Sequence, residues 1–127
     1  MYWRDWNKYI QEHLLANGWI SPEDVHLFYI AKSIDGAVEH VQKFYRRYHS
    51  SRYVGDQLVM RLSEELTDEQ VEQLNQKYDI LVEQGRIEKT QALPQETDHL
   101  ELPRLIFHHT NQDFGILRQM IDTINVM

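Results

Sequence analysis

The sequence predicts an α+β fold in two parts that meet near residue 50. Two observations support this prediction. Residues 1–50 show the pattern helix, apolar strand, helix, whereas residues 53–127 show the pattern strand, helix, strand, strand, helix. In addition, the chain has 127 residues, of which 42% are hydrophobic, and a chain of this size can bury roughly two thirds of its unfolded surface.

The first part is expected to begin with an amphipathic helix. Its apolar residues recur every three or four positions and therefore share one helical face. These residues are Trp3, Trp6, Ile10 and Leu14. We expect the helix to end near Gly18, because glycine commonly follows the last helical turn. Ser21 and Pro22 then supply the start of a short helical turn.

A nearly continuous apolar run, Val25–Ala31, comes next. Such a run predicts a strand buried on both faces, which is typical of a parallel sheet covered by helices. A helix from Asp35 to about His49 is expected after it. The chain does not obviously contain the neighbouring strands of such a sheet. Three interpretations stay open: the strand joins the sheet of the second part, pairs with another copy, or belongs to the tail of a longer protein.

The second part is expected to form a small sheet with two helices on one face. Alternating side chains predict a strand from Tyr53 through Leu62. A capping box at Thr67 predicts the start of an amphipathic helix, and Gly85 is expected to end it.

Two further strands, a polar loop between them and a closing helix complete this part. The predicted segments are a strand Arg86–Leu93, a loop Pro94–His99, a strand Leu102–His109, and a helix capped by Asn111 or Asp113 and running to Ile124. Together with the preceding strand and helix they correspond to a ferredoxin-like β-α-β-β-α unit over residues 53–127 that lacks its final strand.

Composition excludes several kinds of chemistry. The chain has no cysteine, which excludes disulfides, thiolate nucleophiles, zinc ribbons and iron–sulfur clusters. It has no run of ~20 apolar residues and no basic segment followed by an apolar one at its amino terminus, so a cytoplasmic protein is expected. None of its five glycines lies within three residues of another, so no glycine-rich phosphate loop is present.

The segment 43–61 carries five positive charges and one negative charge. Its basic residues alternate with aromatic ones, an arrangement that can bind a phosphate or a nucleic-acid backbone. The candidate phosphate-binding residues are Arg46, Arg47 and Arg52. The other interpretation places the aromatic side chains on the inner face of a helix and the basic ones on its wet side. Because the helical spacing favours the second interpretation, nucleic acid is not the partner we expect first.

Histidines and paired carboxylates do not predict a metal centre or an acid–base pair. His108 and His109 are adjacent on a predicted strand and therefore point to opposite faces. The carboxylate pairs lie at or just before helix starts, where they complement the helix dipole. These pairs are Glu23 with Asp24, Glu64 with Glu65, and Asp68 with Glu69. We therefore expect no metal, no cofactor and no catalytic residue.

Several runs together resemble the carboxyl-terminal region of LOG-like (lonely guy) Rossmann-fold proteins, which were formerly labelled lysine decarboxylase-like. The resemblance covers essentially the whole chain, with its matching segments in the same order. The runs are Tyr2-Trp3, LLANGWISPED at 14–24, FYRRYHSSRYV at 44–54, LPRLIF at 102–107 and FGILRQMIDTIN at 114–125.

The resemblance implies that residues 1–50 are the last helix, strand and helix of a Rossmann domain and that residues 53–127 are an appended domain. It also implies an enzyme family that splits the N-glycosidic bond of nucleoside 5′-monophosphates. The family's Pro-Gly-Gly-x-Gly-Thr-x-x-Glu motif, which binds phosphate and positions a catalytic Glu, is absent from this chain. The resulting hypothesis is a non-catalytic segment that serves interaction, assembly or regulation.

Two alternatives and one partner prediction accompany this hypothesis. The chain could be a stand-alone regulatory module that holds a nucleotide phosphate with Arg46, Arg47 and Arg52. It could also bind nucleic acid through residues 43–61. Since an unpartnered apolar strand seeks pairing, we expect a homodimer formed through Val25–Ala31.

Overall fold

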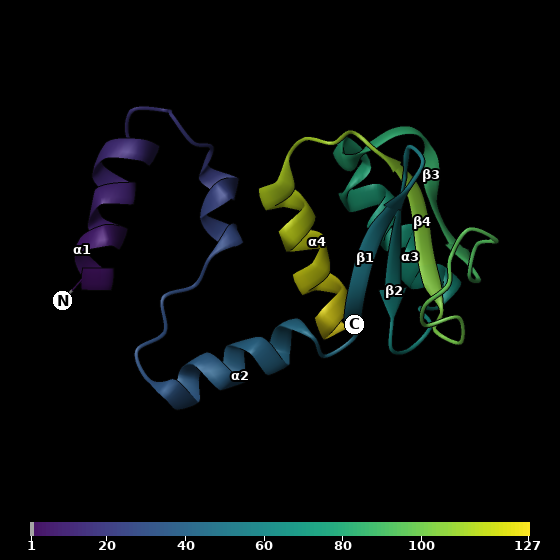
Figure 1. Cartoon of the computed structure of the whole chain (residues 1–127). Helices are drawn as coiled ribbons and strands as arrows, with labels where there is room; N and C mark the ends of the chain where they lie inside the picture. Colours follow the sequence, from purple (N-terminus) through teal and green to yellow (C-terminus); the bar gives the residue numbers. More distant parts are fainter. Residues whose placement is uncertain (1) are drawn as a thin grey trace.

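The computed structural model describes residues 2–127 and shows an α+β fold with a four-stranded antiparallel sheet (Figure 1). The helical segments are α1 (Tyr2–Tyr9), the π-helical η1 (Ile10–Leu15), the 3-10 turns η2 (Pro22–Leu27) and η3 (Asp79–Leu81), α2 (Ile34–Phe44), α3 (Asp68–Lys77) and α4 (Phe114–Val126). The strands are β1 (Tyr48–Val54), β2 (Gln57–Leu62), β3 (Val82–Thr90) and β4 (Arg104–His109). The α+β prediction is confirmed.

The sheet has the strand order β1-β2-β4-β3, and each neighbouring pair is antiparallel. Helices α3 and α4 cover one face, where alternate residues of the strands are buried against them. The buried cluster includes Leu58, Met60, Leu62, Leu74, Ile87, Leu105, Phe107, Met120 and Ile124. This core belongs entirely to residues that follow β1, so the second part of the chain has a hydrophobic centre of its own.

The first strand pair differs from the prediction. We expected a helix to His49 and one strand from Tyr53, but α2 ends at Phe44 and a hairpin of β1 and β2 follows. Gly55, with φ of +63°, provides the left-handed turn residue between the two strands. The helical spacing of Tyr48 with Phe44 was misleading, because Tyr48 packs on the core from the start of β1.

The next helix is shorter than predicted. It starts after Thr67, whose hydroxyl accepts from the Gln70 N–H while the Gln70 side chain accepts from the Thr67 N–H, so the capping box is confirmed. It ends at Lys77 rather than near Gly85. Leu81 reaches the core from η3, and Gly85, with φ of +72°, lies instead at an irregularity within β3.

The last strands and helix follow the sequence closely. Strand β4 covers most of the predicted 102–109 segment, and β3 begins earlier than predicted and ends at Thr90. The strand-helix-strand-strand-helix order is thus found in β2, α3, β3, β4 and α4, with β1 as an additional strand beside β2. Asp113 precedes α4 in a left-handed conformation, but its side chain makes no capping hydrogen bond.

The first part of the chain forms an arm, which we define as residues 2–47. The helix predicted from Trp3 to Leu14 is confirmed, with its last turns widened into η1. The buried strand predicted at Val25–Ala31 is wrong: residues 22–27 form η2, and residues 28–31 are irregular. One reason is local: Pro22 and the Asp24 carboxylate, which accepts from the Ser21 N–H, stabilise the turn. The other is tertiary, because no strand within residues 2–127 lies beside residues 28–31.

Two of the contacts between the arm and the sheet part involve α4. The turn η2 packs on α4, where a Cβ added at Gly115 would collide with the main-chain oxygen of Glu23. At the other end, the buried Asn125 side chain accepts from the N–H groups of Arg47 and Tyr48 and donates to the Phe44 oxygen. Figure 1 shows α1 farthest from the sheet, with η2 between α1 and α4.

Candidate functional site

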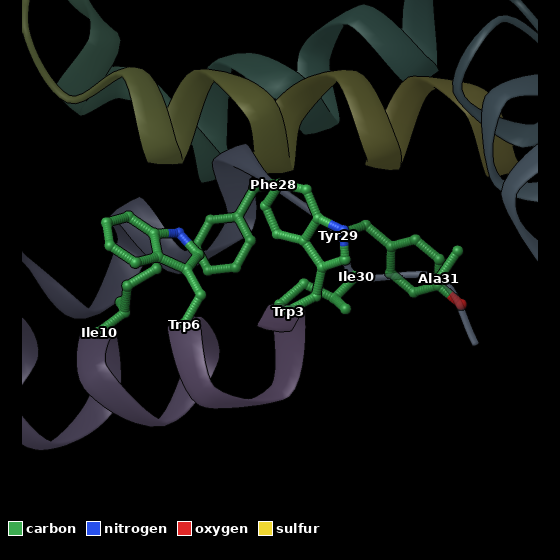
Figure 2. Close-up of a pocket in the computed structure, with 7 residues that line it drawn as sticks. All are labelled: Trp3, Trp6, Ile10, Phe28, Tyr29, Ile30 and Ala31. Carbon is green, nitrogen blue, oxygen red and sulfur yellow. The ribbon is translucent and has the colours of Figure 1, made fainter. Parts of the chain in front are cut away.

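An apolar cavity of about 470 Å³ lies between the first helix and residues 28–31. Trp3, Trp6 and Ile10 line it from one side. Figure 2 shows these side chains projecting from the helix toward Phe28, Tyr29, Ile30 and Ala31 on the other side. Large aromatic side chains that line the cavity remain in contact with solvent: Trp3 is 56% exposed and Tyr29 is 54% exposed.

The main chain of Phe28–Ala31 has no hydrogen-bond partner within residues 2–127. Phe28 has φ of −140° and ψ of 162°, which is an extended conformation. Backbone N–H and C=O groups are obligatory hydrogen-bonding groups, and an extended segment can satisfy them by pairing with a strand. Residues 28–31 therefore present both apolar side chains and free main-chain groups.

Helix α2 and its C-cap residue carry a second set of exposed apolar side chains. Ile34, Val38, Val41 and Tyr45 are spaced by four, three and four residues and therefore share one helical face. Each is at least half exposed, and Ile34 reaches 84%. We name these residues the α2 stripe; they are exposed apolar groups in addition to those of residues 28–31 and α1.

A basic groove of about 370 Å³ lies between α2 and α4. Its charged or titratable lining residues are His40, Lys43, Arg46, Arg118 and Asp122. Arg118 lies over the Phe44 ring, 4.5 Å from its centre, and donates from Nε to the Asp122 carboxylate at 3.1 Å. The His40 ring stacks on Tyr29 with a centroid distance of 4.0 Å.

The structure does not bring the three predicted phosphate-binding arginines together. Arg46 lines the basic groove. The Arg47 guanidinium donates to the main-chain oxygens of Glu64 and Glu65. Arg52 is exposed on β1 opposite Val59, so its side chain lies on the sheet face away from α3 and α4.

A buried ionic cluster, which the sequence did not indicate, holds the loop between β3 and β4 against the sheet. The Glu96 carboxylate accepts from Arg104 at 2.8 Å, from Arg61 at 3.1 Å and from the Leu93 N–H at 2.9 Å. The side chains of Glu96 and Arg104 are fully buried. Arg104 also donates to the oxygens of Asp98, His99 and Leu102, which fixes the course of the loop.

Burial raises the pKa of Glu96, but the Leu93 N–H and the two guanidinium groups outweigh it and leave the pKa below its ordinary value. The carboxylate is therefore charged at neutral pH. Arg104 binds the carboxylate and the loop main chain, and Arg61 binds the carboxylate and the Ser50 hydroxyl, so the contacts of the cluster hold the loop on the sheet. The contact of Glu96 with Arg61 and Arg104 could not be predicted from the sequence, because the spacing of a loop Glu and two strand Arg residues follows no recognisable pattern.

His108 and His109 lie on opposite faces of β4, as predicted. His109 is buried and donates from Nε2 to the Gln112 oxygen, so its Nδ1 accepts from the Tyr53 hydroxyl at 2.7 Å. Burial lowers the pKa of His109 and raises that of Tyr53. Within residues 2–127, no group of three or more His, Asp and Glu side chains is placed to hold a metal ion.

The described part of the chain contains no helix with the length and apolar character needed to span a membrane. Comparisons of the chain with protein-family models, with curated protein sequences and with solved structures found no match in any of the three.

Proposed function

We propose that this chain is a non-catalytic interaction segment of a LOG-like protein, in which the arm packs on the open sheet of a Rossmann-type domain. The observation that carries the proposal is the unpaired main chain of Phe28–Ala31 within the described residues. The partner is a sheet with a free edge strand, because such an edge offers the N–H and C=O groups that residues 28–31 lack.

The surroundings of this segment support a helix-covered sheet as the partner. In an α/β sheet, helices before and after a strand pack on the faces of that sheet. Here α1 precedes residues 28–31 and α2 follows them, and both helices expose apolar side chains. We propose that the partner that pairs with residues 28–31 also covers the α2 stripe and the open side of the aromatic cavity.

We also propose that the sheet part is ferredoxin-like. Its β2-α3-β3-β4-α4 order has both helices on one face, and β1 stands beside β2 in the place of a closing strand. Because this part has a complete core, it serves as the rigid body from which the arm extends.

The test mixes the chain with a separately purified Rossmann domain of a LOG-like protein and follows sedimentation. A complex is expected at roughly tens of micromolar, where an interaction of about 1 μM would be mostly assembled. Val41→Asp, on the α2 stripe, should weaken it at least tenfold, whereas the matched control Gln42→Asp on the same helix should not. No complex, or equal loss with both variants, contradicts the proposal.

Two further measurements bear on alternatives. The chain alone could form a symmetric dimer that Val41→Asp dissociates. That result would mean that a second copy of the chain, and not a Rossmann domain, covers the α2 stripe. Incubation with AMP, or with a cytokinin riboside monophosphate, should release no base, and measurable turnover by the chain alone would overturn the non-catalytic assignment.

A further inference from the structure

We infer that the basic groove between α2 and α4 binds a small molecule that carries a phosphate monoester. This inference goes beyond the proposed function and does not depend on it. It rests on the charge balance of the groove, on a fixed guanidinium group and on an arginine that has no other partner.

The charge balance matches a doubly charged anion. Lys43, Arg46 and Arg118 line the groove against a single carboxylate, Asp122, in a chain whose net charge is −7. The lining therefore has an excess of two positive charges, and a phosphate monoester carries about −1.5 to −2 at neutral pH. Lys43 also pairs with Glu39 at 3.0 Å, but both side chains of that pair are largely exposed, so it is weak.

Arg118 is held in place before any ligand arrives. Its side chain is 16% exposed, packs on the Phe44 ring and donates to Asp122. Its Nη2 lies 3.3 Å from the His40 Nε2, which must accept because arginine has no acceptor. A guanidinium fixed in this way loses little conformational entropy when it binds a phosphate.

Arg46 is available to the ligand. Its guanidinium makes no hydrogen bond or ion pair within residues 2–127, although it lines the groove. Basic side chains near a helix end often bind the last carbonyl groups. At this helix end the Asn125 side chain already donates to the Phe44 oxygen at 2.6 Å, so Arg46 is not needed there.

The remaining walls suit the organic part of the ligand. Phe44 and Val126 line the groove beside the charged groups. A volume of about 370 Å³ lies at the lower end of the range of small-molecule sites. A nucleoside monophosphate is the probe of matching size and charge.

The test is calorimetric titration of the whole chain with AMP, with inorganic phosphate and with adenosine. We expect saturable binding of AMP that weakens as salt is added, weaker binding of inorganic phosphate and none of adenosine. If inorganic phosphate binds as tightly as AMP, the ligand is the free ion and not an ester, and the inference that the groove also binds an organic group is wrong. Equal binding of AMP and adenosine overturns all of it.

Variants identify the surface. Arg46→Gln should weaken AMP binding at least tenfold, and this exposed substitution should not affect folding. The matched control Lys77→Gln removes one positive charge at the far end of α3 and should leave affinity unchanged. The assignment to this groove is contradicted if Lys77→Gln or Arg52→Gln weakens AMP binding as much as Arg46→Gln does, or if Arg46→Gln does not weaken it. Because the titration uses the chain alone, its failure is distinguishable from failure to bind a Rossmann domain.

Discussion

At the scale of single residues, the most consequential interactions are those of Glu96, a loop residue whose carboxylate is fully buried between two arginines. A buried ion pair adds little net stability when complete, because desolvation offsets the attraction of the charges. Removing one partner is different, since the remaining charges stay buried without compensation.

Glu96→Gln should therefore lower the free energy of unfolding by about 3–5 kcal/mol, because Arg61 and Arg104 stay buried without a counter-charge. Urea unfolding measures the change. Glu101→Gln is the matched control on the same loop, since Glu101 is exposed and should change stability by less than about 0.5 kcal/mol. Equal effects of the two substitutions would show that the buried cluster does not hold the loop.

Stability should fall with acid in two steps. The pKa of His109 is lowered in the folded state, so the unfolded chain takes up a proton first as the pH falls through the ordinary value of 6.5. The pKa of Glu96 is also lowered, so a second loss begins as the pH falls through the ordinary value of 4.5. Thermal unfolding across this range measures both steps, and His109→Gln should remove only the first.

At the scale of elements, the crossing of η2 over α4 depends on Gly115. Alanine normally stabilises a helix interior by ~1 kcal/mol relative to glycine. Here Gly115→Ala should instead lower the stability of the fold, because the added Cβ would collide with the Glu23 main chain and lie 2.8 Å from the Asp24 nitrogen. Calorimetry should show a lower Tm, and limited proteolysis should show faster cleavage in residues 2–33.

Gly36→Ala is the control for this substitution. A Cβ at Gly36, within α2, would approach only the Ser33 hydroxyl, at 3.1 Å, and a shift of a few tenths of an ångström relieves this contact while the hydroxyl still accepts from the Gly36 N–H. The control should therefore leave the cleavage of residues 2–33 unchanged. A stabilised Gly115→Ala protein would mean that η2 does not press on α4 in solution.

The elements that sequence could predict are those set by local chemistry. The capping box at Thr67, the apolar spacing of Trp3, Trp6 and Ile10, and the alternation in β2 all appear as expected. The hairpin before β2 was missed because the aromatic spacing of Phe44 and Tyr48 also fits a helix. The apolar composition of Val25–Ala31 predicts a strand, but a strand requires a neighbour and the described chain supplies none.

The candidate site was predicted only in part, for the same reason. The basic run predicts Arg46, which lines the groove, together with Arg47 and Arg52, which do not. Arg47 binds the Glu65 main-chain oxygen, and Arg52 lies on β1 opposite Val59. Arg118, 72 positions after Arg46, could not be associated with it without the packing of α4 against α2.

At the scale of the whole molecule, the arm and the sheet part differ in how much they bury. Among residues 2–127, the buried hydrophobic side chains other than Ile10 lie between Leu58 and Ile124, whereas α1, α2 and residues 28–31 expose large apolar groups. Hydrogen exchange should therefore be fast for the amides of the arm and slow for β2 and β4, because the arm can open without breaking the core. Binding of the proposed Rossmann domain should slow exchange in residues 28–45. Uniform protection of both parts in the free chain would contradict this difference.

Asn125 gives this arrangement a mechanical consequence. The Asn125 side-chain amide, on α4, forms hydrogen bonds with the main chain at the end of α2 and at the beginning of β1. A partner that tilts α2 must either pull α4 along or break three bonds at this joint. If the proposed partner docks on the arm and tilts α2, we therefore expect the basic groove to change as well, because α2 and α4 form its two walls.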